Sequence, residues 1–99
     1  MVQGKTDEIP RETNRPIPLP NVTFSTFILS LNTSALFHLG DVPDPATGEK
    51  KNDLVLAKHA IDTLSMLRDK TVNNLDEDEK RLLETVLFDL QLRFVKASS

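Results

Sequence analysis

Ser34 and His38 are four residues apart, which places them one turn apart on a helix. A hydroxyl hydrogen-bonded to an imidazole is the arrangement of a nucleophile and its general base. However, the sequence identifies no donors for an oxyanion and no third residue to orient the imidazole. Serines inside helices also usually bond to the backbone of their own helix. We therefore expect a structural pair, no catalytic residues, and a protein that is not an enzyme.

Three acidic residues, Asp41, Asp44 and Glu49, follow His38 in a loop. Oxygen-rich loops can bind a divalent cation. Their spacing matches no calcium-binding loop, and aspartate before proline is a common turn former. With no cysteine and only two histidines in the chain, the usual structural zinc sites are excluded. We expect no metal and no cofactor, although the sequence leaves open whether this acidic loop binds a cation.

Hydrophobic periodicity predicts an all-α fold of three helices in a small bundle that oligomerisation completes. We expect the helices over residues 23–39, 53–70 and 76–96. Prolines and a glycine-containing turn separate the first two. The predicted capping residues are Asn21 or Thr23, then Asn52 or Asp53, then Asp76 with Glu79, and Gly40 should end the first helix.

One face of each helix should form the core. On the first helix this face holds Phe24, Phe27, Ile28, Leu31, Ala35 and Leu39. On the second it holds Leu54, Leu56, Ala57, Ala60, Ile61, Leu64 and Leu67. On the third it holds Leu82, Leu83, Val86, Leu87, Leu90 and Phe94.

Apolar and small polar residues remain outside these faces, and they are the candidate interface. The first helix belongs to a run from Pro16 to Gly40 without a charged residue, and its second face mixes small hydroxyls with a phenylalanine. Small residues four apart allow another helix to approach closely. Because monomers seldom expose a large apolar patch, something should cover these positions. The predicted interface residues are Thr26, Leu29, Ser30, Thr33, Ser34, Leu36, Phe37, Phe88, Leu92 and Val95.

Composition argues against two further classes of protein, those that bind nucleic acid and those that span a membrane. The chain has 99 residues and a net charge of −3, so we expect one domain over residues 21–97, preceded by a disordered or extended arm over residues 1–20. A mildly acidic chain without Trp or Tyr is unlike a nucleic-acid-binding protein. The uncharged run is too short and too polar to span a membrane. We expect a cytoplasmic protein without nucleic-acid or membrane partners.

The segments FSTFILSLNTSALFHLG, PDPATGEKKNDLVLAKHAIDTLSMLRDKT and NLDEDEKRLLETVLFDLQLRFV resemble the family catalogued as domain of unknown function eighteen-forty-four. The resemblance covers about residues 22 to 96. It implies an all-helical, cytoplasmic, bacterial protein, and it carries no activity or catalytic residue to transfer.

The sequence therefore favours a non-enzymatic, self-associating structural or interaction module, either a dimer or a tetramer. Two alternatives stay open. One is an adaptor that binds a helix of a different protein. The other is a carrier of a small apolar ligand in a pocket lined by Phe24, Phe27 and Phe37.

Overall fold

The computed structural model describes residues 19–44 and 46–99. Three helices make up its regular structure: α1 (Phe24–Leu39), α2 (Leu54–Lys70) and α3 (Glu77–Ala97). Each lies within one residue of its predicted bounds, and no strand occurs in the part described, which confirms the all-α prediction. Residues 1–18 of the expected arm, and Pro45 of the expected turn, are outside the described residues.

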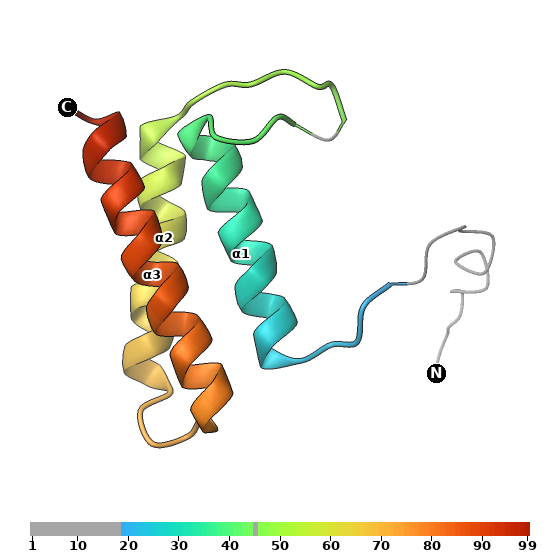
Figure 1. Ribbon diagram of the computed structural model, residues 1–99, viewed down its shortest axis with the longest axis vertical. Helices are drawn as coiled ribbons and strands as arrows, with labels where there is room; N and C mark the ends of the chain where they lie inside the picture. Colours follow the sequence, from blue (N-terminus) through green and yellow to red (C-terminus); the bar gives the residue numbers. More distant parts are fainter. Residues whose placement is uncertain (1–18, 45) are drawn as a thin grey trace.

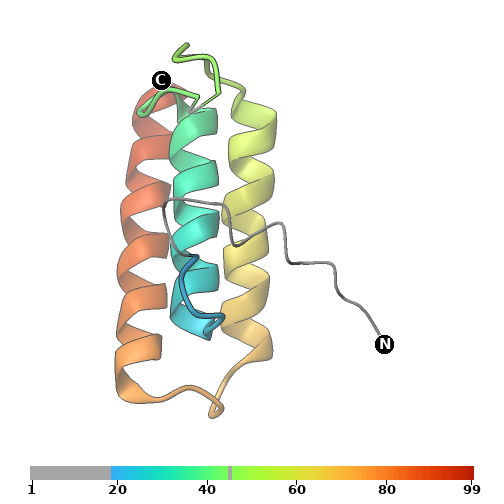
Figure 2. The same ribbon diagram turned by 90° about the vertical axis from the view of Figure 1, so that its right-hand side faces the viewer.

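The helices run up, down and up, so that α2 is antiparallel to both of its neighbours (Figure 1). Each helix packs against the other two. From the side, α1 lies in front of the layer formed by α2 and α3 (Figure 2). The result is a triangular bundle in which every helix keeps one outward face.

The first helix begins and ends at strong capping signals. Thr23 has an extended backbone, and its hydroxyl accepts a hydrogen bond from the Thr26 amide at 3.0 Å. The Thr26 hydroxyl accepts in return from the Thr23 amide at 3.0 Å. This reciprocal pair is a capping box with threonine in place of the usual glutamate, and it selects Thr23 over Asn21 as the cap.

Aspartates cap the other two helices. The Asp53 carboxylate accepts from the Leu56 amide at 3.1 Å. The Asp76 carboxylate accepts from the Glu79 amide at 2.8 Å, while the Glu79 carboxylate accepts from the Asp76 amide at 3.0 Å, as predicted. Three acidic residues fill the first turn of α3, where the helix dipole favours negative charge.

Gly40 ends α1 and brings α2 to it. Its φ of +83° lies in the left-handed region, and the Gly40 and Asp41 amides donate to Phe37 O and Leu36 O. This pattern is a Schellman motif. The chain then returns over the end of α1, where the Asp53 amide donates to His38 O at 2.7 Å. A Cβ atom at Gly40 would lie 3.3 Å from both Lys51 O and Asn52 Cβ.

Gly40→Ala should therefore lower the free energy of unfolding by roughly 2–3 kcal/mol, because left-handed strain of about 1–2 kcal/mol adds to the crowding. Gly48→Ala is the matched control, since Gly48 also has positive φ (+75°) but no atom within 4 Å of its Cβ position. Urea unfolding of both variants measures the difference. Equal decreases in the free energy of unfolding for Gly40→Ala and Gly48→Ala would show that the close approach of Gly40 to Lys51 contributes nothing to the effect.

The core lies between the three helices and is entirely apolar among the described residues. All three helices contribute, and the completely buried large side chains are leucine and isoleucine. The buried residues are Ile28, Ala35, Leu39, Ala57, Ala60, Ile61, Leu64, Leu83, Val86, Leu87 and Leu90.

Two residues predicted for the core lie largely outside it. Phe27 is 47% exposed and Leu56 is 46% exposed. At 100° per residue, each lies about 90° from the centre of the buried arc on its helix. A residue at that angle is buried only if the neighbouring helix reaches it, and here the neighbours do not cover these two side chains.

Candidate interaction surface

The outward face of α1 is uncharged and partly apolar. We define this face, the α1 surface, by the exposed residues Phe27, Leu29, Ser30, Thr33 and Ser34. Phe27 and Leu29 are each 47% exposed, and none of the 16 residues of α1 carries a formal charge at neutral pH with histidine neutral. A second helix could therefore lie on the α1 surface without placing an ionised side chain out of water.

Two hydroxyl groups of the α1 surface donate within their own helix. Ser30 Oγ donates to Phe27 O at 2.7 Å, and Thr33 Oγ1 donates to Leu29 O at 3.1 Å. Thr26 Oγ1 donates to Asn21 O at 2.8 Å. A buried hydroxyl is costly when its proton has no acceptor. Covering Ser30 and Thr33 would not incur that cost, because their protons already have acceptors.

Three of the predicted interface residues, Thr26, Leu36 and Phe37, are less accessible than the others. Leu36 is partly buried and packs against the core. Phe37 is also partly buried, and its ring lies 5.2 Å from the His38 ring at an interplanar angle of 53°. The accessible apolar atoms of α1 are therefore concentrated toward its first half, around Phe27 and Leu29.

The outward face of α3 carries a second apolar feature. Phe88, Leu92 and Val95 are 65%, 52% and 62% exposed. We call these three residues the α3 stripe. They lie within about 60° of one another at 100° per residue, so they form one continuous line along the helix. The α3 stripe and the α1 surface are on different helices and point away from the common core.

An ion network borders the α3 stripe. Arg93 Nε donates to the Asp89 carboxylate at 2.8 Å, and Arg93 Nη1 donates to the Asp41 carboxylate at 3.1 Å. The hydrogen bond that Arg93 donates to Asp89, followed by the one that it donates to Asp41, raises the pKa of Arg93, so the guanidinium stays charged. Through Asp41 the network also connects α3 to the loop after α1.

Exposed apolar side chains on α2 were not among the predicted interface residues. Val55 is 79% exposed and Met66 is 47% exposed. Both lie off the apolar arc of α2, a signal that the sequence contains. Charged residues separate Val55 from Met66, because the Lys58–Asp62 ion pair, at 2.7 Å, lies on the turns of α2 between them.

The candidate catalytic and metal-binding residues do not form a site in the described structure. No side-chain hydrogen bond joins Ser34 to His38 in residues 19–44 and 46–99, and the same residues contain no cluster of three potential metal ligands. The Asp44 carboxylate instead accepts from the Ala46 amide at 2.8 Å, and the Asp44 carbonyl accepts from the Gly48 amide at 2.7 Å. Asp41 is bound to Arg93. Asp44 thus holds the turn, and Asp41 holds the loop to α3.

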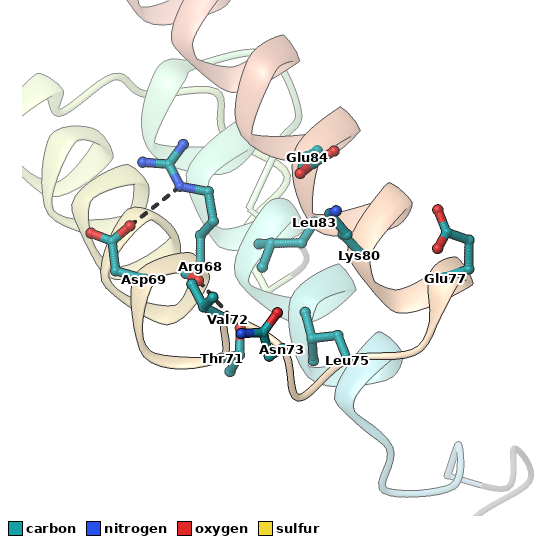
Figure 3. Close-up of a pocket in the computed structure, with 10 residues that line it drawn as sticks. All are labelled: Arg68, Asp69, Thr71, Val72, Asn73, Leu75, Glu77, Lys80, Leu83 and Glu84. Carbon is teal, nitrogen blue, oxygen red and sulfur yellow. Dashed lines mark hydrogen bonds and ion pairs between the residues drawn. The ribbon is translucent and has the colours of Figure 1, made fainter.

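A cavity of about 460 Å³ lies where α2 turns into α3 (Figure 3). Leu83 and Leu75 contribute apolar surface, and charged residues of both signs surround them, including Arg68 and Glu84. The Arg68–Asp69 ion pair, at 3.5 Å, lies on its α2 side. None of the three phenylalanines predicted to line a ligand pocket borders this cavity.

Within the described residues, no helix has both the length and the apolar character needed to cross a membrane. A family model described as Domain of unknown function (DUF1844) matches residues 21–96. The chain belongs to this family. The DUF1844 match begins just before the Thr23 cap and ends in the last turn of α3, so it takes in the residues of both apolar surfaces. No curated protein and no solved structure matches the chain.

Proposed function

We propose that this protein is a non-enzymatic structural or interaction module of the cytoplasm that associates with copies of itself through the α1 surface. The observation that carries the proposal is the combination found on α1: exposed Phe27 and Leu29 on a helix without charge, beside Ser30 and Thr33, whose hydroxyl protons already have acceptors.

Symmetry makes the absence of charge important. In a two-fold contact the same patch is used by both chains, so residues near the axis meet their own copies. A charged residue there would meet a like charge. The α1 surface can meet itself without this repulsion, whereas the outward faces of α2 and α3 both carry lysines and acidic residues.

Small size supports the same proposal. A core of this size rarely supplies more than about 3–5 kcal/mol of net stability. The chain has no cysteine, and its described residues contain no cluster of three potential metal ligands. Burying the α1 surface against another chain would add apolar burial at roughly 25 cal/mol per Å².

The experiment is thermal unfolding at two protein concentrations 100-fold apart, followed by circular dichroism. Unfolding that is coupled to dissociation has a midpoint that rises with concentration. With an unfolding enthalpy of about 0.7 kcal/mol per residue, we expect a rise of roughly 10 °C for a dimer. A midpoint independent of concentration would contradict self-association in that range.

A further inference from the structure

The α3 stripe has a spacing that nearly reproduces itself when the helix is reversed. Phe88 and Val95 are seven residues apart, and Leu92 lies half a residue from their midpoint. At 1.5 Å per residue, this offset is less than about 1 Å. Reversal about the midpoint therefore exchanges Phe88 with Val95 and leaves Leu92 almost in place.

We infer that α3 packs against α3 of a second copy, antiparallel, about a two-fold axis beside Leu92. The inference rests on the proposed self-association and adds a second contact to the one formed by α1. In this register Phe88 faces Val95 of the second copy, and Leu92 faces Leu92. Gln91, next to the axis on the other flank, would face its own copy, where two amides can donate to and accept from each other.

The charges beside the stripe agree with this register. Lys96 and Asp89 lie on the same flank of α3, and antiparallel helices bring equal flanks together. Lys96 of one copy would reach the level of residue 87 of the other, about 3 Å along the axis from Asp89. The Asp89 carboxylate already accepts from Arg93 through Oδ2, and its second oxygen can accept from Lys96.

The parallel alternative places like charges at the same level along the helix axis. The two copies of Glu84 would have no axial separation, and neither would the two copies of Lys96. In the antiparallel register the two copies of Glu84 are about 22 Å apart along the axis and those of Lys96 about 14 Å apart. Charge thus selects the antiparallel arrangement.

Two separate two-fold contacts have a structural consequence. The α1 surface joins one pair of chains, and the α3 stripe joins two such pairs. When two isologous contacts close on each other, the product is a tetramer of dihedral symmetry. The assembly expected from both contacts therefore contains four chains.

Single introduced cysteines test the register, because the natural chain contains none. The variants are Phe88→Cys, Leu92→Cys and Val95→Cys, with Thr85→Cys as an exposed control on the same helix. Each is incubated with oxidised glutathione and run on a non-reducing gel. A disulfide needs Cα atoms about 4.4–6.8 Å apart.

We expect Leu92→Cys to cross-link at least tenfold faster than the other three. Two copies of residue 88 or of residue 95 would be about 10 Å apart along the axis, and two copies of residue 85 about 20 Å apart. An equal mixture of Phe88→Cys and Val95→Cys should cross-link to a mixed dimer. Self-linking of Phe88→Cys and Val95→Cys at the rate of Leu92→Cys would show parallel helices and overturn the inference. Absence of both the Leu92→Cys and the mixed products would also overturn it.

A double variant distinguishes the α3 contact from the α1 contact. Ser30→Glu is introduced into Leu92→Cys to break the α1 contact. If the α3 contact exists, cross-linking persists in the double variant. If only the α1 contact exists, Leu92→Cys does not cross-link at all, while Ser30→Glu still lowers the mass of the assembly.

Discussion

Ser30→Glu is expected to halve the mass of the assembly while leaving the helical fold intact. Ser30 is exposed near the centre of the α1 surface, and a two-fold contact there brings its two copies close together. Burying an unpaired carboxylate costs several kcal/mol, and two like charges add to that cost. We expect the dissociation constant to rise by at least 100-fold, or about 2.7 kcal/mol. Sedimentation equilibrium of both proteins measures the change.

The fold should tolerate this substitution, because glutamate has a higher helix propensity than serine. Val55→Glu is the matched control, since it places the same charge at a 79% exposed position on α2, outside both proposed contacts. Its mass should equal that of the natural chain. Equal masses for Ser30→Glu and the natural chain would remove the α1 surface as the interface.

Leu64→Ala is expected to have the largest effect on folding. Leu64 is completely buried at the middle of the core, and its removal leaves a cavity between helices that cannot close fully. Substitutions of this kind lower the free energy of unfolding by about 2–5 kcal/mol. The whole net stability of a domain this small is of about the same size. Urea unfolding followed by circular dichroism measures the loss.

Leu56→Ala provides the comparison on the same helix with the same chemistry. Leu56 is 46% exposed, so much of its side chain is already in water. Leu56→Ala should lower the free energy of unfolding by less than half as much as Leu64→Ala does. Similar losses would mean that Leu56 is covered in solution, and would place it in an interface rather than on a free surface.

The sequence predicts the local features of this fold well, because local hydrogen bonds decide them. Thr23, Asp53 and Asp76 each precede a helical pattern, and each caps a helix in the structure. Gly40 follows the last apolar residue of α1 and adopts positive φ there. In each case the signal and the group that it satisfies are within a few residues of each other.

Features that depend on how the helices are placed are harder to predict. The Arg93–Asp41 bond joins residues 52 positions apart, and nothing in either local sequence marks the pair. The angular position on a helix similarly fails to separate Phe27, which is half exposed, from Leu36, which packs against the core. Both lie about 90° from the centre of the buried arc, on opposite sides. Which side a neighbour covers is decided by the packing of all three helices.

The exposure of the α3 stripe could be predicted from its angular position on the helix, whereas the exposure of Phe27 could not. Phe88, Leu92 and Val95 lie opposite the buried arc of α3, where neither neighbour can reach. Position opposite the arc was thus a good guide on α3, whereas Phe37, which lies opposite the buried arc of α1, is partly buried and needed the structure.

The mass of the natural chain in solution tests the central claim most directly. Size-exclusion chromatography with light scattering at tens of micromolar measures it without assumptions about shape. Self-association through the α1 surface alone predicts twice the chain mass of 11.1 kDa, and the two contacts together predict four times that mass. A single species of 11.1 kDa would contradict the account.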